Sequence, residues 1–528
     1  MDNSYNINEE LPYTFFIDIF EIKSDELYVM GHCTSQHIIA KANNKAITTK
    51  DLYFNRYSDK SNPIKNYFIE FKIPLSQQGE LKLEFESENG RRMNIDFSKQ
   101  CNFSKIVGYA KSKKYLSILK GNEILIQKKT TLKWIKHEIK AIFNMLKHPK
   151  RSSFIVIPFR LAYLIGYPIF EKQHIWFFMD RPNIADDSGL HLFRYAANKD
   201  KNIKKYFIAS KDCPNYDEIR KIGDVIPFQS LKHRYLTLFA ENIITTHPEN
   251  PIIYPFWNSF PYYAGLIKSN TCFLQHGITK DDISIWLNKS EMNLSMFVTS
   301  SPKEYESVLE NKYNYDDSVV KLVGLPRFDN LKNEEDKKEI LIMPSWRNYL
   351  NNKPAEEIYE SGLFKRFNSL INNEKLISYA KDHDYKIIFK PHPRIYKFLD
   401  LFDKNEYVKI ASSDTEYQPL FNRGSILITD YSSVAFDFAY LKKPVVYYQY
   451  SEDYHFNLED GYFKYDTMGF GEIVKDENEL VDIIIDYIEN KCQMKDEYVK
   501  RVDDFFLFTD KNNCKRVYEE IKKIPPKE

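Results

Sequence analysis

Several features that define common protein classes are missing from this sequence. It has six cysteines but no CxxC pair, a pattern that excludes a disulfide framework or a zinc ribbon and is typical of a reduced, intracellular protein. The first sixteen residues contain no basic stretch followed by an apolar run, so no secretory signal is expected. There is also no run of about 18 uncharged apolar residues that would predict a transmembrane helix.

A strong net charge and the usual catalytic loops are absent as well. The formal net charge is only +1, which gives no global attraction to nucleic acid. No GxxxxGK(S/T) loop, GxGxxG turn, HExxH helix or GxSxG elbow occurs. The acidic pairs Asp186-Asp187 and Asp281-Asp282 are interpreted as surface carboxylates rather than as metal ligands. We therefore expect no nucleic acid partner, no metal and no other cofactor.

The sequence does contain enough apolar and aromatic residues for several hydrophobic cores. Of its 528 residues, 43% are hydrophobic and 15% are aromatic, which excludes disorder and predicts about three domains. Short β-rich runs such as Tyr13–Ile22 and Tyr67–Ile73 are separated by Ser, Asn and Gly clusters. They predict a small sandwich-like β domain over residues 1–104. Because this region holds no catalytic cluster, we expect it to be an accessory module.

Residues 105–172 are strongly basic, with fifteen Lys and Arg residues and three Glu residues. Apolar residues between Leu132 and Leu146 recur at helical spacing beside lysines, and the apolar run Phe154–Phe170 is interrupted by two prolines and an arginine. A basic amphipathic helix followed by a broken apolar patch fits a surface that rests on anionic lipid. The alternative is a linker helix that docks on the next domain and leaves its lysines in solvent.

From His174 onward the pattern changes to strand-like runs that alternate with helical ones. Two successive series of such runs are separated by the charged linker Asn333–Lys338. The alternation predicts an α/β fold with two doubly wound Rossmann-like domains, over residues 173–332 and 333–528. Ligands of open parallel sheets bind at the carboxyl ends of the strands, so the chemistry is expected in a cleft between two sets of strand ends.

The first candidate in that cleft is His276, which follows the apolar run Thr271–Leu274 and precedes Gly277. Glycine permits a substrate to approach closely. An imidazole with its ordinary pKa of about 6.5 can accept a hydroxyl proton at neutral pH. His276 is therefore a candidate general base. The alternative is a histidine that is hydrogen-bonded within a turn.

A second candidate is the loop Lys390-Pro391-His392-Pro393-Arg394, which also follows a strand. Its two prolines stiffen the loop, so its three potential cations, Lys390, His392 and Arg394, suit a diphosphate. The alternative is a rigid exposed turn with solvated charges. Arg347, in the run Met343–Arg347, is expected to point into the same cleft and to clamp a phosphate.

A third candidate is the strand and polar turn Ile426–Ser433, which a helix follows. Ser432 and Ser433 stand at the start of that helix, where unpaired backbone N–H groups favour an anion. Their hydroxyls can donate to phosphate or simply cap the helix. Asp437 lies about one helical turn further on, a position suited to bonding ribose hydroxyls.

Together these motifs resemble the CDP-glycerol glycerophosphotransferase family, the teichoic-acid primases and polymerases and related capsule enzymes. The motifs that carry the resemblance are, in order, His276-Gly277, Gly324-Leu325-Pro326-Arg327-Phe328-Asp329, Pro344–Arg347, Lys390–Pro393, Thr429–Ser433 and Lys443-Pro444. The resemblance covers residues 174–510. It implies a GT-B fold and metal-independent transfer by a cytoplasmic enzyme that is peripheral on the inner face of the bacterial cell membrane.

The resemblance also implies roles for individual residues. His276 would deprotonate the acceptor hydroxyl, which would attack the β-phosphorus of CDP-glycerol or CDP-ribitol and expel CMP. His392, with Lys390 and Arg347, would neutralise the charge that develops on the diphosphate. Thr429 is grouped with the phosphate-binding residues, although we expect it chiefly to shape the turn.

On the acceptor side the loop contains Gln275, Gly277 and Lys280. Many family members carry Trp before the histidine and Lys five residues after it, whereas this chain has Gln275 and places Lys280 four residues after it. The acceptor, a lipid-linked or polymer hydroxyl, is therefore left open by the sequence.

Other functions would use the same cleft. The runner-up is a GT-B glycosyltransferase that uses a nucleotide sugar for cell-surface polysaccharide synthesis. A nucleotide-sugar epimerase would leave the basic segment 105–172 unexplained, and a non-catalytic polymer-binding protein would leave the ionisable groups of the cleft without a role.

Overall fold

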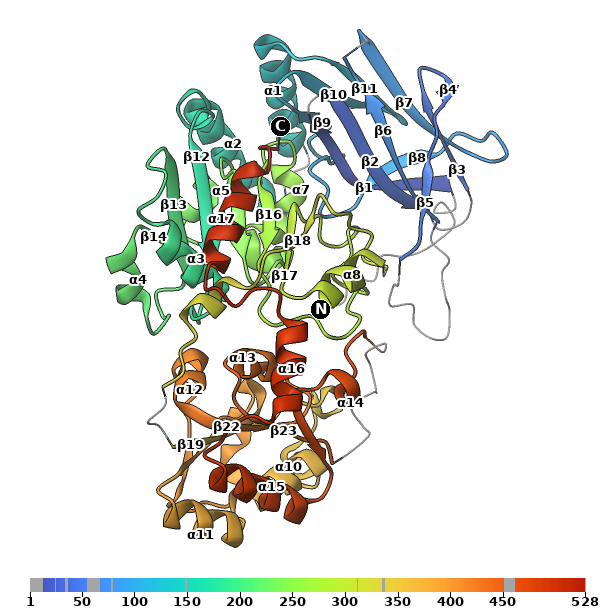
Figure 1. Ribbon diagram of the computed structural model, residues 1–528. Helices are drawn as coiled ribbons and strands as arrows, with labels where there is room; N and C mark the ends of the chain where they lie inside the picture. Colours follow the sequence, from blue (N-terminus) through green and yellow to red (C-terminus); the bar gives the residue numbers. More distant parts are fainter. Residues whose placement is uncertain are drawn as a thin grey trace.

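In the computed structural model the chain forms a β sandwich, a helical hairpin and two α/β domains (Figure 1). In Figure 1 the sandwich, in blue, lies beside the first α/β domain, and the second α/β domain, in orange and red, lies below it. The structure describes residues 13–23, 25–33, 37–54, 67–76, 79–147, 150–310, 312–334, 338–450 and 461–527. The first twelve residues and residues 335–337 of the predicted linker lie outside this part of the chain.

The N-terminal sandwich consists of two sheets with the strand orders β5-β6-β2-β1-β8 and β4-β3-β7-β11-β10-β9. Phe15 and Phe85, both fully buried, meet in its core with ring centroids 4.1 Å apart. The strands are β1 (Thr14–Lys23), β2 (Glu26–Cys33), β3 (Ile38–Ala42), β4 (Lys45–Ala46), β5 (Lys50–Leu52), β6 (Tyr67–Pro74), β7 (Glu80–Ser87), β8 (Asn94–Phe97), β9 (Tyr109–Lys111), β10 (Tyr115–Lys120) and β11 (Glu123–Lys128).

This β-rich region extends beyond residue 104, where the sequence interpretation ended it. β9, β10 and β11 complete the second sheet, so the part of segment 105–172 before Thr131 is not helical as predicted. β10 and β11 pair across a two-residue turn that contains Gly121, whose φ is 59°. Such a turn predicts a hairpin, which the charge-based interpretation of this lysine-rich segment did not include.

The helical hairpin that follows consists of α1 (Thr131–Lys147) and α2 (Arg151–Phe170). α2 continues through Pro158 and Pro168, which were expected to interrupt it. Each proline removes one helical hydrogen bond, but most helical stability in proteins comes from the packing of one face. That face of α2 is buried along Val156, Arg160 and Tyr163.

A buried ion pair joins the two helices of the hairpin and fastens them to the first α/β domain. Arg160 Nε and Nη2 donate to the carboxylate of Glu138 at 2.5 and 2.8 Å, and both side chains are fully buried. Arg160 Nη1 donates to the carbonyl oxygens of Tyr262 and Ala264, and the hydroxyl of Tyr109 donates to Glu138. Every strong donor and acceptor of this cluster therefore has a partner, as burial requires.

The first α/β domain has a parallel sheet of order β14-β13-β12-β15-β16-β17-β18. Its strands are β12 (His174–Met179), β13 (Ile203–Ala209), β14 (Val225–Pro227), β15 (Asn242–Thr245), β16 (Asn270–Phe273), β17 (Met296–Thr299) and β18 (Val320–Leu322). Its helices are α3 (Ser188–Ala196), α4 (Tyr216–Ile222), α5 (Leu231–Thr237), α6 (Asn250–Ile253), α7 (Phe260–Tyr263) and α8 (Pro302–Glu310).

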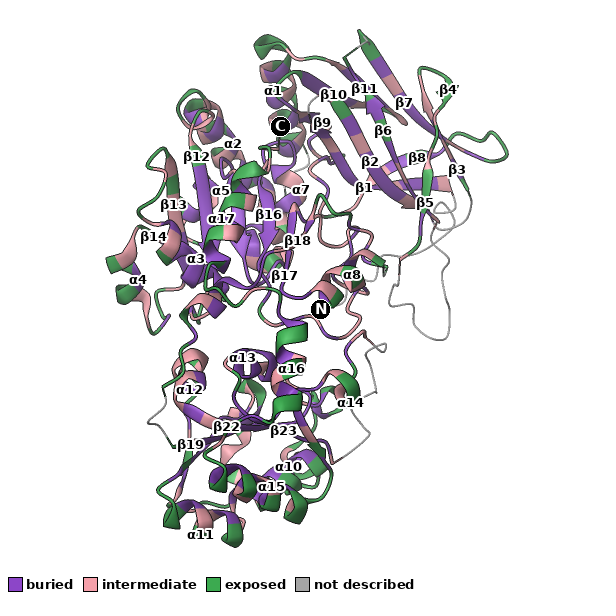
Figure 2. Ribbon diagram, in the orientation of Figure 1, coloured by how far each residue is buried: buried purple, intermediate pink, exposed green. Residues whose placement is uncertain are grey.

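The second α/β domain has a parallel sheet of order β21-β20-β19-β22-β23-β24. Its strands are β19 (Glu339–Met343), β20 (Lys386–Phe389), β21 (Val408–Ile410), β22 (Gly424–Thr429), β23 (Val445–Tyr448) and β24 (Gly471–Val474). The helices of this domain are α9 (Ala355–Tyr359), α10 (Gly362–Ile371), α11 (Glu374–Asp382), α12 (Tyr417–Arg423), α13 (Val434–Tyr440), α14 (Tyr465–Met468), α15 (Glu477–Glu489) and α16 (Asp496–Phe505), and α17 (Asn513–Lys523) ends the chain. Figure 2 shows the strands of both sheets largely buried beneath helices with exposed outer faces. The predicted GT-B architecture, two doubly wound domains preceded by a β-rich domain, is confirmed.

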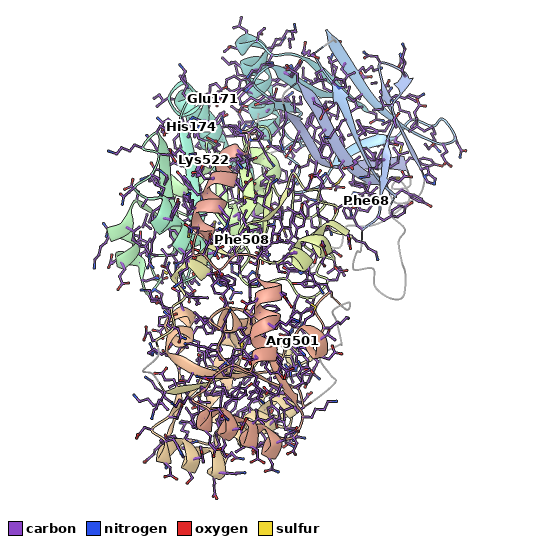
Figure 3. All side chains as sticks on the ribbon, viewed as in Figure 1. Phe68, Glu171, His174, Arg501, Phe508 and Lys522 are labelled. Atoms are coloured by element: carbon purple, nitrogen blue, oxygen red, sulfur yellow. The ribbon has the colours of Figure 1, made fainter. Side chains whose placement is uncertain are left out.

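The C-terminal helix α17 leaves the second domain and packs on the first, although residues 333–528 were expected to form one domain. The ring of Tyr518 lies 5.5 Å from that of Trp176 in β12, and its hydroxyl donates to Asp200 at 2.8 Å. In Figure 3, Lys522 on α17 lies in the upper part of the molecule with His174, whereas Arg501 on α16 lies in the lower domain. The end of the chain therefore ties the two α/β domains together.

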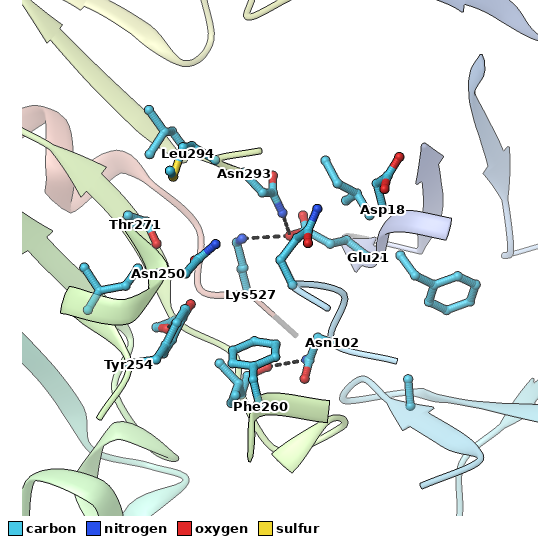
Figure 4. A pocket seen from close by; sticks show the side chains of 18 of the residues that line it. Asp18, Glu21, Asn102, Asn250, Tyr254, Phe260, Thr271, Asn293, Leu294 and Lys527 are labelled. Atoms are coloured by element: carbon cyan, nitrogen blue, oxygen red, sulfur yellow. Dashed lines mark hydrogen bonds and ion pairs between the residues drawn. The ribbon is translucent and has the colours of Figure 1, made fainter. Parts of the chain in front are cut away.

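The sandwich and the first α/β domain enclose a small cavity of about 90 Å³ (Figure 4). Within it the carboxylate of Glu21 accepts bonds from Lys527 and Asn293, each at 2.7 Å. Burial alone would raise the pKa of Glu21, but Lys527 and Lys23 outweigh it and lower that pKa. A half-buried ion pair thus lies at the contact between the accessory domain and the first α/β domain.

The ion pair of the hairpin yields a stability prediction. Glu138→Ala leaves the Arg160 guanidinium buried without its carboxylate, which should cost roughly 3–5 kcal/mol. Hydrogen exchange of α1 and α2 amides should accelerate accordingly, because exchange reports local opening. As a control, Glu123→Ala removes a partly exposed carboxylate that pairs with Lys82 and Arg92 and should cost about 1 kcal/mol or less. Unchanged exchange in α1 and α2 of the Glu138 variant would contradict this account.

Candidate active site

The candidate site lies where the carboxyl ends of the two parallel sheets face each other. Two cavities, of about 560 and 380 Å³, adjoin there. Both are lined by Arg181 and His276 of the first domain and by His392, Ser432 and Ser433 of the second. The three positions on which the sequence interpretation depends, 276, 392 and 432, therefore surround one cleft.

His276 enters the cleft from a kinked strand end. Gln275, which follows β16, adopts a left-handed φ of 61° that turns the chain and exposes the next side chain. The Nδ1 of His276 lies 3.2 Å from the carbonyl oxygen of Thr246. Because a carbonyl only accepts, Nδ1 carries the proton and Nε2 keeps a lone pair. The side chain is exposed at the cleft, but the surrounding protein partly desolvates the ring and so lowers the pKa of His276, and Asp187 opposes this effect.

Gly277 allows the two domains to meet at this point. A Cβ atom on Gly277 would lie 2.7 Å from the hydroxyl oxygen of Ser433, closer than such atoms normally approach. The glycine was predicted to let a substrate approach the histidine closely. In the structure it is Ser433 of the second domain that lies close to it.

Two neighbours of His276 were missed in the sequence. The ring of His247 stacks on His276 with centroids 4.6 Å apart and an interplanar angle of 15°. Arg181 Nε donates to His247 Nε2 at 2.8 Å, so that nitrogen must be unprotonated, and burial lowers the pKa of His247 to about 3. Both residues follow strand ends, β12 and β15, so the reasoning that selected His276 would have found them.

The stiff loop after β20 offers fewer cations than predicted. Lys390 is buried, and its ammonium group donates to the carbonyl oxygens of Ser412 and Ser413 at 2.7 and 3.3 Å; it lines neither cavity. His392 accepts the backbone N–H of Arg394 at its Nδ1, and burial lowers its pKa to about 4. His392 is therefore a neutral donor through Nε2–H at pH 7, and the exposed guanidinium of Arg394 is the cation that this loop presents.

Arg347 and Thr429 also differ from expectation. Arg347 lines the larger cavity but is buried, and its Nη1 donates to Asp430 at 2.9 Å, so it is not a freely available phosphate clamp. The hydroxyl of Thr429 is fully buried and donates to the carbonyl of Met343 at 2.6 Å. It shapes the turn, as expected, and does not reach a phosphate.

Ser432 and Ser433 are half-buried at the start of α13 and line both cavities. The Ser432 hydroxyl accepts the N–H of Val434 at 3.4 Å, and the Ser433 side chain makes no capping bond. Asp437 lines the smaller cavity, but its carboxylate is held by Arg327. Burial raises the pKa of Asp437, and Arg327 opposes that rise.

Two of the residues predicted for the acceptor side, Gln275 and Lys280, are bonded to other side chains of the protein. Gln275 is among the residues that line the larger cavity, but it is fully buried and its side-chain amide donates to Glu304 and to the carbonyl of Val298. Lys280 lines the larger cavity, but its ammonium group is paired with Asp281.

The acidic pair Asp186-Asp187 is not a simple surface pair. Both residues line the smaller cavity, and Asp187 is bonded to Arg327. No group of three or more potential metal ligands is found among the residues that the structure describes.

A protein-family comparison gives these features a context. The family described as CDP-Glycerol:Poly(glycerophosphate) glycerophosphotransferase matches residues 161–523. This chain belongs to that family. Residues 276, 347, 392 and 432 all lie within the matched range, so the cleft belongs to the part of the chain that the family covers.

Individual relatives agree with this assignment. The chain is 40% identical over 504 residues to the minor teichoic acid biosynthesis protein GgaB of Bacillus subtilis, covering 93% of this chain and 52% of GgaB. It is 30% identical over 203 residues to the teichoic acid glycerol-phosphate transferase of Staphylococcus aureus, covering 35% of this chain and 49% of that protein. The chain thus spans about half the length of these relatives.

A solved structure, that of the wall teichoic acid polymerase TagF, superposes with a TM-score of 0.54 at 16% identity. The superposition covers 75% of this chain and 99% of that one. At this identity the likeness establishes the shared fold.

The position of His276 predicts the pH dependence of catalysis. A general base must be unprotonated, so activity falls as pH drops through its pKa. Desolvation by the walls of the cleft lowers that pKa below its ordinary value, with Asp187 and Glu249 opposing and Arg181 assisting. If His276 is the base, the acid limb of kcat/KM should therefore have its midpoint below about pH 6.5. A midpoint at or above that pH, measured with CDP-glycerol as donor, would contradict His276 as the titrating base.

Proposed function

We propose that this chain transfers an alditol phosphate, glycerol phosphate in the first instance, from a CDP-activated donor to a hydroxyl acceptor and releases CMP. The proposal depends on one observation: His276 of the first domain faces His392, Ser432 and Ser433 of the second across a common cleft. The names of the relatives favour a teichoic acid as the product, and a capsule polymer is the alternative product.

In the proposed reaction, Nε2 of His276 removes the acceptor proton while the acceptor oxygen bonds to the β-phosphorus. The bond from that phosphorus to the bridging oxygen breaks, and CMP leaves with the oxygen. Negative charge that develops on the phosphates is met by the Nε2–H of His392, the guanidinium of Arg394 and the hydroxyls of Ser432 and Ser433. Catalysis of this kind depends on positioning and on preorganised donors.

Donor specificity is the direct test. We expect CMP release from CDP-glycerol, with CDP-ribitol as the second donor and no turnover of UDP-sugars. His276→Ala should lower kcat by roughly 10²–10⁴-fold, the usual contribution of a general base. His383→Ala, which alters an exposed histidine at the end of α11, serves as the control and should retain activity. Turnover of a UDP-sugar instead would favour the nucleotide-sugar glycosyltransferase.

We also propose that the α1–α2 hairpin rests on anionic lipid, which places the enzyme peripherally on the inner face of the cell membrane. Its outer face exposes large apolar side chains: Leu132, Ile139, Phe143, Leu146, Phe154, Ile155, Leu161, Ile165 and Ile169. Exposed lysines of α1, among them Lys133, Lys136 and Lys140, flank this stripe. An apolar stripe with flanking lysines suits an in-plane position at a lipid headgroup layer.

α2 is long and apolar enough to cross a membrane by length and composition. An in-plane position is favoured because the opposite face of α2 is packed on protein: Arg160 is fully buried and paired with Glu138. A spanning helix would have to break this pair and take the guanidinium into lipid, at a cost of several kcal/mol.

Vesicle sedimentation tests this surface. Ile165→Asp should reduce binding to phosphatidylglycerol vesicles, because it places a carboxylate on the apolar face. A Lys133→Glu, Lys136→Glu, Lys140→Glu triple variant should reduce it by roughly a hundredfold or more, at about 1 kcal/mol per lysine. Leu231→Asp provides the matched control, because Leu231 is 75% exposed but lies on α5. Equal binding by all variants would contradict the proposal.

A further inference from the structure

Arg327 lines the smaller cavity of the cleft, and its side chain bonds to both α/β domains. It lies in a short 3-10 helix, η3 (Pro326–Asn330), which follows β18, the last strand of the first sheet, and precedes β19, the first strand of the second. Arg327 therefore stands on the segment that crosses between the domains. The family motif that contains it, Gly324–Asp329, was noted in the sequence without a role.

The guanidinium of Arg327 bonds to one carboxylate from each domain. Nε and Nη2 donate to the two oxygens of Asp437 in α13 of the second domain, at 2.6 and 2.8 Å. Nη1 donates to Asp187 Oδ1, at the start of α3 in the first domain, at 2.8 Å. The backbone carbonyl of Arg327 also accepts a bond from Gln418 in α12 of the second domain, at 2.8 Å.

The rest of the motif holds this crossing segment in place. The carboxylate of Asp329 accepts the backbone N–H groups of Asn513 and Cys514, at 2.8 and 2.7 Å, where α17 begins. Gly324 has a φ of 78°, and a Cβ atom there would lie 2.1 Å from the side-chain oxygen of Asn513. The crossing segment and the returning helix α17 are thus fitted to each other, and the Arg327 side chain has little freedom to move.

All three charged residues line the smaller cavity together with His276, Ser432 and Ser433. Burial would raise the pKa of Asp187, but Arg327 outweighs that effect and lowers it. A carboxylate has about four acceptor positions, and Arg327 occupies two of those of Asp437 in a bidentate pair, which fixes the plane of the carboxylate.

We propose that Arg327 is a positioning residue. It orients the Asp437 carboxylate toward the hydroxyl groups of the donor nucleotide. Through its bond to Asp187 it also holds the two domains in the relative position that binds the donor. The inference rests on the proposed function. Arg327 takes no part in proton or phosphoryl transfer, so its loss should weaken donor binding more than it slows the chemical step.

The test compares three variants of the full-length chain. Arg327→Lys keeps the charge but loses the bidentate geometry, so we expect KM for CDP-glycerol and Kd for CMP to rise about tenfold or more, with kcat within about threefold. Asp187→Asn keeps an oxygen for capping α3 but removes the first-domain charge, and should also raise both constants. Arg423→Lys alters an arginine that pairs with Glu339 inside the second domain, outside both cavities, and should change neither constant.

The outcomes separate this inference from the proposed function. If the unaltered chain releases no CMP from any CDP-alditol, the proposed function fails, whereas CMP binding by the variants can still be measured by calorimetry. If the unaltered chain is active and Arg327→Lys leaves KM and Kd unchanged, the positioning role is overturned. If Asp187→Asn alone leaves them unchanged, the link between the domains is overturned. A fall in kcat at constant KM in Arg327→Lys would show a role in the chemical step instead and would also overturn the inference.

Discussion

The architecture depends on two parallel sheets whose carboxyl ends face each other closely enough for loops of one domain to contact those of the other. In a parallel sheet all strands end at the same edge, so polar residues that follow different strands are gathered without long loops. Here the contact is tight enough that a Cβ atom at position 277 would lie 2.7 Å from the hydroxyl oxygen of Ser433, so a larger residue would require that side chain to shift. The pairing of an imidazole from one domain with a serine-rich turn from the other follows from this approach.

The electrostatics of the cleft rely more on neutral donors and paired charges than on free cations. Lys390 and Arg347 are engaged with carbonyl and carboxylate groups of their own domain, and burial keeps His392 neutral by lowering its pKa to about 4. A site that holds fixed dipoles and few mobile charges needs little reorganisation when charge develops on a phosphate. The carbonyl oxygen of Thr246 accepts from Nδ1 of His276, and the ring of His247 stacks on that of His276. These two contacts orient the imidazole and leave its lone pair on Nε2.

Among the residues that the structure describes, two ion pairs with little exposure to solvent hold the parts outside the two α/β domains in place. Glu138 and Arg160 fasten the hairpin, and Glu21 and Lys527 lie between the sandwich and the first domain. Unpaired charges in such positions would cost several kcal/mol each. These pairs specify how the domains sit on one another, and they leave the apolar outer face of the hairpin exposed to its surroundings.

Much of this protein was determined locally by its sequence. The strand runs of both α/β domains, the turn after β22 and the strand-end position of His276 could be predicted because hydrophobic periodicity and turn residues act over a few neighbouring positions. The sequence did not reveal the strands β9–β11, the return of α17 to the first domain, the stacking of His247 or the partners of Lys390, Arg347, Gln275 and Asp437. The β10–β11 hairpin has a local turn signal, and only its pairing with β7 joins distant segments. The other features depend on contacts between residues far apart in the chain, and whether a charged side chain faces a ligand or another side chain is decided only when those distant segments pack together.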